Sequence, residues 1–78
     1  MKHGLSFQDA ELIFQDRTIS FQDDRFDYGE KRFITLGKLQ QRIVVIVHTD
    51  RNNVTRIISM RKANEREQKI YQQRLKKN

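Results

Sequence analysis

The sequence contains no cysteine, no proline and no tryptophan, and only three glycines among its 78 residues. Without cysteine the chain forms neither a disulfide framework nor a thiolate metal site, which is compatible with a reducing compartment. Its two histidines are too few for a zinc signature. No apolar run reaches the roughly 20 residues of a membrane-spanning helix, and the N-terminus lacks the signal-peptide pattern. We therefore expect a cytoplasmic protein with no metal, no cofactor and no membrane association.

Acidic residues become scarce in the last third of the chain. Residues 1–53 carry eight Lys or Arg and eight Asp or Glu, whereas residues 54–78 carry eight Lys or Arg and only two Glu. All of the net charge of +6 therefore lies in the C-terminal third. A basic surface concentrates polyanions and is the usual footprint of nucleic-acid binding. A basic terminal helix is also often only a solvated face, so charge alone leaves both interpretations open.

The hydrophobic pattern predicts a small antiparallel sheet flanked by helices. Ser6 and Asp9 resemble a capping box, and the apolar spacing after them predicts a helix over about 7–15. A short strand is expected at 18–22, followed by a polar loop at 23–30. Three further strands are expected over residues 31–37, 42–49 and 54–60. The run from Ile43 to Val47 is apolar without alternation, which is typical of a central strand covered on both faces.

The last helix is predicted to begin after Asn64, with Glu67 completing a capping box, and to end near Lys76. Its apolar stripe is narrow and fits docking on the sheet. No repeat or linker divides the chain, so we expect one domain over residues 1–78, of class α+β with three to four strands. Such a short chain has a small core and modest stability.

The predicted hairpin between residues 42 and 60 decides which side chains meet. If DRNN at 50–53 forms a four-residue loop, Thr49 pairs with Val54, and strand alternation then places His48, Ser59 and Arg61 on one face. The other face is more apolar and is expected to pack on the helices. The first face is then open. A change of one residue in the pairing would exchange these partners.

Basic residues surround the junction between the last strand and the last helix. Metal-free cleavage of RNA needs activation of the ribose 2′-OH, stabilisation of a dianionic phosphorane and protonation of the 5′ oxygen. Arginine suits the middle task, because its guanidinium stays charged and binds two phosphate oxygens at once. Proton transfer and base stacking have candidates of the right type as well: His48, Glu30 or Glu67 for protons, and Tyr71 or Tyr28 for stacking.

Each of these residues also has a structural interpretation. A lone histidine at a strand end is more often hydrogen-bonded or exposed than catalytic. Glu67 fits a helix cap, Tyr71 fits the core, and Arg61 and Lys62 fit solvated charges. Composition and periodicity alone thus indicate a small basic α+β domain.

The order of several segments is more specific. KHGLSFQDAELIF at 2–14, EKRFITLG at 30–37, VVIVHT at 44–49 and RIISMRKANERE at 56–67, followed by Tyr71, resemble the BrnT family of ribonuclease toxins from bacterial type II toxin–antitoxin systems. The resemblance covers nearly the whole chain. It implies a RelE-like fold and a metal-independent endoribonuclease that cleaves mRNA and arrests growth.

The resemblance also implies a partner. A BrnA-type antitoxin is expected to neutralise the toxin and to bind operator DNA through its ribbon-helix-helix segment, so that the toxin meets DNA only through the antitoxin. Family members usually carry an additional strand and the start of the first helix before the KHG segment, whereas this chain starts at Met1. The resemblance therefore implies an N-terminally short domain with an exposed sheet edge.

Site residues follow by matching positions. The resemblance implies a catalytic set of Arg61, Arg56, His48, Glu30 and Arg32, and a substrate-binding set of Lys62, Arg66, Ser59 and Tyr71. Arg61 and Arg56 are expected to stabilise phosphate or transition-state charge with support from Arg32, and His48 or Glu30 to transfer protons.

Two other functions compete with the nuclease. One is an inactive remnant that binds RNA or antitoxin without cleaving. The other is an interaction protein whose basic helix docks on an acidic partner and never touches RNA.

Overall fold

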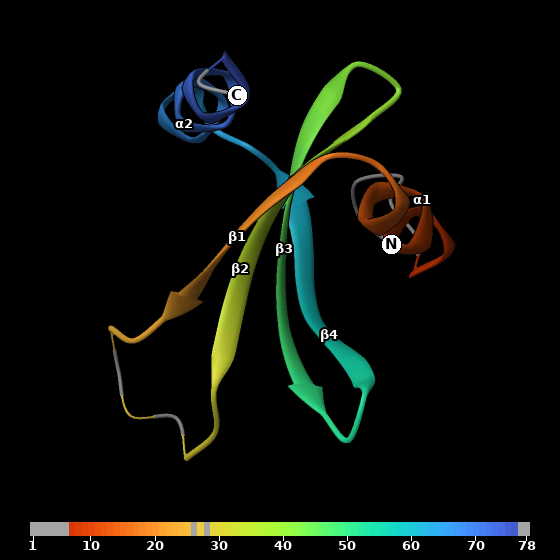
Figure 1. Ribbon diagram of the computed structural model, residues 1–78, viewed down its shortest axis with the longest axis vertical. Helices are drawn as coiled ribbons and strands as arrows, with labels where there is room; N and C mark the ends of the chain where they lie inside the picture. Colours follow the sequence, from red (N-terminus) through yellow and green to blue (C-terminus); the bar gives the residue numbers. More distant parts are fainter. Residues whose placement is uncertain (1–6, 26, 28, 77–78) are drawn as a thin grey trace.

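The computed structural model describes residues 7–25, 27 and 29–76. Its elements in chain order are α1 (Phe7–Gln15), β1 (Thr18–Asp23), β2 (Arg32–Leu39), β3 (Arg42–Arg51), β4 (Val54–Lys62) and α2 (Glu65–Lys76). The four strands form one antiparallel sheet in the order β1-β2-β3-β4 (Figure 1). The α+β prediction is confirmed. The predicted cap at Ser6 and the stacking candidate Tyr28 lie outside the described residues.

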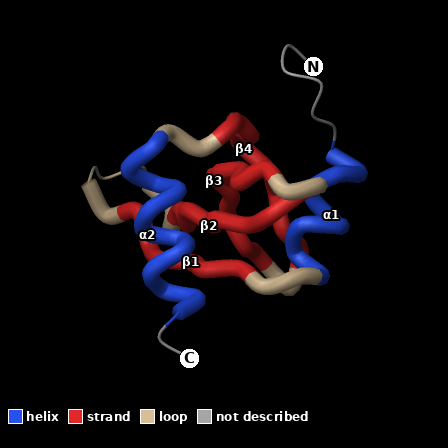
Figure 2. The backbone as a smooth tube through the Cα atoms, turned by 90° about the horizontal axis from the view of Figure 1, so that it is seen from above, coloured by secondary structure: helices blue, strands red, loops and turns tan. Residues whose placement is uncertain are grey.

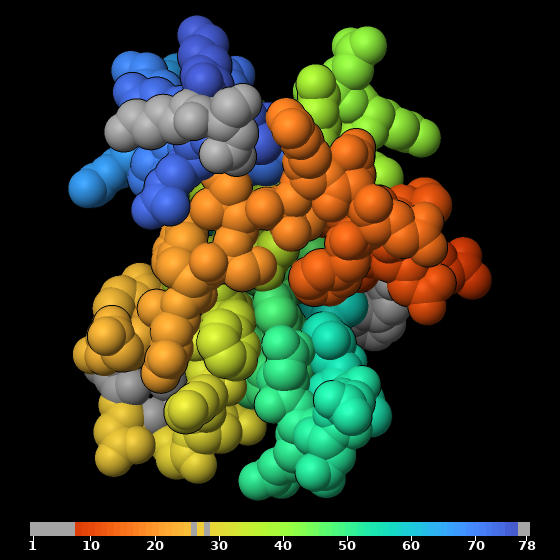
Figure 3. All heavy atoms as spheres, in the orientation of Figure 1, coloured from red at the N-terminus to blue at the C-terminus, as the bar shows by residue number. Residues whose placement is uncertain are grey.

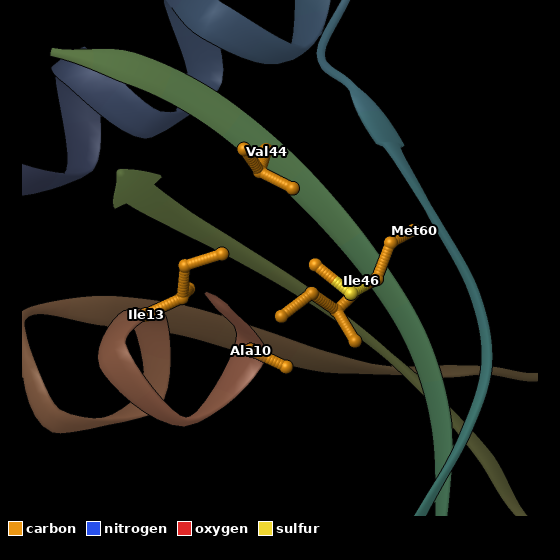
Figure 4. Packing of buried hydrophobic residues seen from close by; sticks show 5 residues of the cluster. All are labelled: Ala10, Ile13, Val44, Ile46 and Met60. Atoms are coloured by element: carbon orange, nitrogen blue, oxygen red, sulfur yellow. The ribbon is translucent and has the colours of Figure 1, made fainter. Parts of the chain in front are cut away.

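The two helices lie on opposite faces of the sheet (Figure 2). One buried cluster joins α1 to β3 and β4, and Figure 4 shows its members facing one another: Ala10, Ile13, Val44, Ile46 and Met60. A second buried cluster joins α2 to β2 and β3: Leu36, Val45, Ala63 and Tyr71. Strand β3 supplies residues to both clusters, which is why its sequence is apolar without alternation. The prediction of a central strand covered on both faces is confirmed, and the prediction that one face is free of helices is wrong.

Gly37 in β2 allows α1 to approach the sheet closely. A Cβ atom at this position would collide with the Ile13 side chain, which is fully buried. Glycine thus leaves the space that Ile13 fills, and β2 lies directly against α1.

The β2–β3 and β3–β4 hairpins each have a turn of two residues. Asn52 and Asn53 have φ angles of 52° and 64°, and Gln40 and Gln41 have φ angles of 49° and 69°. Positive φ at both central residues is typical of the type I′ turn, whose twist matches that of the strands it joins. The predicted four-residue loop at 50–53 is therefore wrong. The flanking strands continue through Arg51 and begin again at Val54.

A β-bulge in β4 changes which face its last residues occupy. His48 pairs with Ile57, whereas its neighbour Val47 pairs with Ser59, so Ile58 has no partner on β3. One extra residue inverts the alternation beyond it. Ser59 and Arg61 consequently lie on the α2 face, opposite to His48, and their predicted grouping with His48 is wrong.

Helix α2 starts with the predicted capping box. The Asn64 side-chain oxygen accepts the Glu67 amide at 2.8 Å, and the Glu67 carboxylate accepts the Asn64 amide at 2.9 Å. The helix then packs at one end of its sheet face. Figures 1 and 3 show that the opposite end, where the β1–β2 loop and the β3–β4 turn lie, extends well beyond α2.

Candidate functional site

Arg61 is held by a bidentate ion pair at the end of β4. Its two terminal nitrogens donate to the two Glu67 oxygens at 2.8 and 2.7 Å, and Nη1 also donates to the Lys62 carbonyl at 3.3 Å. The Arg61 side chain remains 48% exposed and that of Glu67 20% exposed. The guanidinium is therefore fixed in orientation and still open to solvent.

The pair stays charged over the neutral pH range. Hydrogen bonding to Arg61 lowers the pKa of Glu67 below its ordinary value of 4.5. The same hydrogen bond to Glu67 raises the pKa of Arg61. A carboxylate with a lowered pKa is a poor proton donor at neutral pH, so Glu67 is suited to orienting Arg61 rather than to transferring protons.

The bulge brings two arginines of β4 to one face. Arg56 pairs with Thr49 and lies on the α2 face, and Arg61 follows five residues later. Without a bulge, residues five apart on a strand point to opposite faces. Because Ile58 is an extra, unpaired residue between them, Arg56 and Arg61 point to the same face. Arg56, the exposed Ser59 and Arg61 thus follow one another along the same side of the strand.

The neighbouring strands add two more arginines to this face. Arg32 pairs with Asp23 across β1 and β2 and lies 3.7 Å from Glu30, which is 42% exposed. Arg25 binds both oxygens of Asp23 at 2.8 and 3.0 Å. The pKa of Arg61 is raised chiefly by its hydrogen bond to Glu67, and the positive charge of Arg25 opposes part of that rise. Arg25 is placed on this face by its bond to Asp23, the strand partner of Arg32.

Sequence reasoning missed Arg25. It lies in a segment rich in acidic residues, and only the folded bend after β1 brings its guanidinium onto the Asp23 carboxylate. The arginine-rich face consists of Arg25, Arg32, Arg56 and Arg61 with Ser59, and we call this group the arginine face.

His48 belongs to the other side of the sheet. It is only 4% exposed, its Nε2 lies 2.7 Å from the Thr35 hydroxyl, and its Nδ1 lies 3.1 Å from the Asp50 carboxylate. In the tautomer that donates from Nδ1–H to the Asp50 carboxylate, Nε2 accepts from the Thr35 hydroxyl. Ser20 in turn lies 2.6 Å from the Thr35 hydroxyl. The structure thus places His48 in a buried hydrogen-bonded chain and away from Arg61.

Aromatic rings complete the environment of His48. Phe14 of α1 meets it edge-on at 5.2 Å and Phe33 of β2 stacks on it at 5.8 Å, measured between ring centroids. Both ring nitrogens are engaged and the ring is enclosed. This is the hydrogen-bonded, structural interpretation of the histidine.

The predicted substrate-binding residues separate into two groups. Lys62 and Arg66 are exposed on either side of the β4–α2 junction. Tyr71 is 3% exposed, and its hydroxyl donates to the Arg17 carbonyl at 2.9 Å, while burial raises its pKa. The buried Tyr71 ring packs in the core under α2, where it does not offer a face to a base.

Within the described ranges, no group of three or more His, Cys, Asp or Glu side chains is arranged to hold a metal ion. The same part of the chain has no helix of the length and apolarity needed to cross a membrane.

The chain matches the model of a known protein family. The BrnT toxin family model, described as the ribonuclease toxin BrnT of type II toxin–antitoxin systems, matches residues 1–67. The chain belongs to this family. No curated protein and no solved structure matches it. BrnT membership implies a ribonuclease toxin that acts on RNA and has an antitoxin partner. The matched residues include the whole arginine face and end at Glu67, the partner of Arg61.

Proposed function

We propose that this BrnT-family chain is a cytoplasmic endoribonuclease that cleaves mRNA without a metal ion and uses the arginine face to bind the scissile phosphate. The observation that carries the proposal is the orientation of Arg61, whose guanidinium is fixed by Glu67 while the side chain as a whole remains 48% exposed. Arg56 and Ser59 lie on the same side of the strand and extend the surface that a phosphodiester can contact.

The hydrogen-bond pattern of Arg61 leaves one fork of donors for phosphate. Glu67 uses the end of the guanidinium between Nη1 and Nη2, and the Lys62 carbonyl uses the remaining Nη1 hydrogen. An arginine has five N–H donors, and the two that remain are Nε–H and the outer hydrogen on Nη2. These two are parallel and match two oxygens of a phosphate. No partner among the described residues takes them.

Cleavage proceeds by attack of the ribose 2′ oxygen on the adjacent phosphorus, which breaks the bond to the 5′ oxygen and leaves a 2′,3′-cyclic phosphate. The departing 5′ oxygen takes up a proton from water or from the protonated base. Negative charge accumulates on the phosphorane oxygens, and preoriented cations stabilise it more than they stabilise the substrate. We assign this role to Arg61 and Arg56, with Arg32 in support. Glu30 is assigned proton removal from the 2′-OH because it is exposed beside Arg32, whereas His48 is buried.

The proposal is tested with purified protein, single-stranded RNA and excess chelator. Wild type is expected to cleave, and Arg61→Gln to lower the cleavage rate about 100-fold, the usual effect of removing one transition-state donor. Lys69→Gln is the matched control, because it removes one positive charge from an exposed position of α2. Equal activity of the two variants contradicts the assignment of Arg61. Loss of wild-type cleavage with chelator contradicts metal independence, and RNA binding without products supports a binding-only protein.

We also propose that the antitoxin is of the BrnA type, with a ribbon-helix-helix segment for operator DNA, and that it covers the basic C-terminal third with carboxylates. A partner that binds only the folded chain stabilises it by mass action, by about 2.7 kcal/mol at a concentration one hundred times its Kd. For a domain of this size the melting temperature is expected to rise by about 10 °C or more. Thermal melts with and without the co-expressed antitoxin measure this, and an unchanged midpoint in a confirmed complex contradicts it.

A further inference from the structure

A basic cleft, separate from the arginine face, lies between the β2–β3 hairpin and α2. Its volume is about 360 Å³. Figure 1 shows the hairpin and α2 at the same end of the sheet, and Figure 2 shows α2 alongside β2. Apolar residues and Tyr71 form part of its lining, and the polar part consists of three cations and three side-chain amides: Lys38, Arg42, Lys62, Gln41, Gln68 and Gln72.

The charge of this cleft is of one sign. No Asp or Glu lines it, and none of its three cations takes part in an ion pair among the described residues. The arginine face differs, because Glu67, Asp23 and Glu30 compensate part of its charge. An anion that enters the cleft is attracted by all three cations at once, and a partly enclosed site strengthens that attraction.

The cleft adjoins the β4–α2 junction that carries Arg61. Arg61 and Lys62 are consecutive in β4, and Glu67 and Gln68 are consecutive in α2. At the β4–α2 junction, Arg61 and Glu67 form the ion pair, while Lys62 and Gln68 line the cleft. A chain of phosphates bound at Arg61 can therefore continue into the cleft around the start of α2.

We propose that this cleft is a second phosphate-binding subsite, which holds a phosphodiester of the RNA strand outside the scissile position. The inference rests on the proposed nuclease function for its ligand. The lysine, arginine and side-chain amide N–H groups of the lining can donate to phosphate oxygens, and contacts to phosphate carry no base information. The subsite thus adds affinity without adding sequence preference, and it lengthens the RNA segment that the protein holds.

Two triple variants with matched charge test the subsite. The cleft variant carries Lys38→Gln, Arg42→Gln and Lys62→Gln, and the control variant carries Lys69→Gln, Arg74→Gln and Lys76→Gln. Each loses two lysines and one arginine from exposed positions, and none of the control residues lines the cleft. Affinity is measured with a short 2′-O-methyl RNA, which binds but lacks the attacking hydroxyl.

The cleft variant is expected to bind this RNA about tenfold more weakly at about 0.1 M salt, and the control less than about threefold more weakly. The slope of log Kd against log salt should fall by about 0.7 for each phosphate contact that is lost. Equal affinities and slopes for the two variants overturn the proposal. Where the triple variant does not fold, Lys62→Gln and Lys69→Gln provide the same comparison with one charge each.

A second measurement does not depend on RNA cleavage. Titration with inorganic phosphate is expected to shift the side-chain amide resonances of Gln41, Gln68 and Gln72 in wild type and to leave them unshifted in the cleft variant. Absence of these shifts in wild type overturns the proposal. A glutamate-rich peptide that binds wild type but not the cleft variant, while both bind RNA equally, also overturns it and identifies the cleft as a protein-docking surface.

The two proposals fail in different ways. If wild type cleaves RNA and the cleft and control variants bind RNA alike, the subsite is wrong and the nuclease function stands. If wild type does not cleave, yet the cleft variant binds RNA more weakly than the control, the subsite stands and the nuclease function is wrong.

Discussion

The two faces of the sheet each carry a basic side chain paired with a carboxylate, yet the pairs have opposite characters. On the α1 face, His48 lies 3.1 Å from Asp50 with its side chain 5% exposed. On the α2 face, Arg61 lies 2.7 Å from Glu67 with its side chain 48% exposed. The buried ring has both nitrogens engaged inside the fold, whereas the exposed guanidinium keeps donors for a ligand. Access, rather than residue type, separates a structural pair from a candidate catalytic one.

The comparison predicts that His48→Ala harms stability and spares chemistry. The substitution removes the ring between Phe14 and Phe33 and leaves the buried Thr35 hydroxyl without its acceptor. We expect the free energy of unfolding to fall by about 2 kcal/mol or more. Denaturant unfolding measures this loss, and RNA cleavage per folded molecule should match wild type.

Thr35→Val serves as the companion variant for His48. It keeps the shape of the threonine but removes the hydroxyl that joins Ser20 to His48, so it should also destabilise the fold without affecting cleavage. A well-folded His48→Ala protein that no longer cleaves RNA would contradict the structural role of His48 and would support a role in proton transfer.

Glu67→Gln is expected to have a smaller effect, and on activity rather than on stability. Glutamine preserves the capping box with Asn64 but removes the charged, bidentate partner of Arg61. Cleavage should fall about tenfold as the guanidinium becomes less well oriented. Because the ion pair is partly exposed, the free energy of unfolding should fall by less than about 1 kcal/mol. Glu65→Gln, the other acidic residue of the first turn of α2, is the control.

Acidification should reproduce the effect of this variant. The pKa of Glu67 lies below its ordinary value of 4.5, so the pair contributes fully above about pH 4.5 and its contribution is lost as the pH falls through the lowered folded-state pKa. Wild type and Glu67→Gln should therefore converge in stability at acid pH and differ most near neutrality. Equal pH profiles of wild type and Glu67→Gln would show that the carboxylate does not support Arg61.

The sequence predicted the elements better than the pairing of their side chains. The helix over residues 7–15 and the capping box of Asn64 and Glu67 are confirmed, because both depend on local spacing. The grouping of His48 with Arg61 is wrong. The error arises at Ile58, since a bulge depends on the twist and packing of two strands and has no local sequence signal here.

The turn at Asn52 and Asn53 illustrates a different limit. The Asn-Asn pair fits a two-residue turn, because asparagine tolerates positive φ. The predicted four-residue loop did not take this preference into account. That error shifted the pairing by two residues and so left the faces near the turn unchanged. Burial of Tyr71 was one of its two interpretations from the sequence. The position of Arg25 could not be predicted, because it depends on the folded loop after β1.

The unpaired Ile58 makes the number of residues in β4 as important as their composition. Another residue at this exposed position keeps the count between Arg56 and Arg61, so the side chains there can vary with little effect on the arginine face. Loss of one codon from this stretch would remove the bulge and leave Arg56 and Arg61 four residues apart in regular alternation, still on one face. Gain of one codon without a second bulge would instead turn Arg61 toward α1, without altering a single charge. Surviving length changes in this segment should accordingly be losses and not gains of one residue.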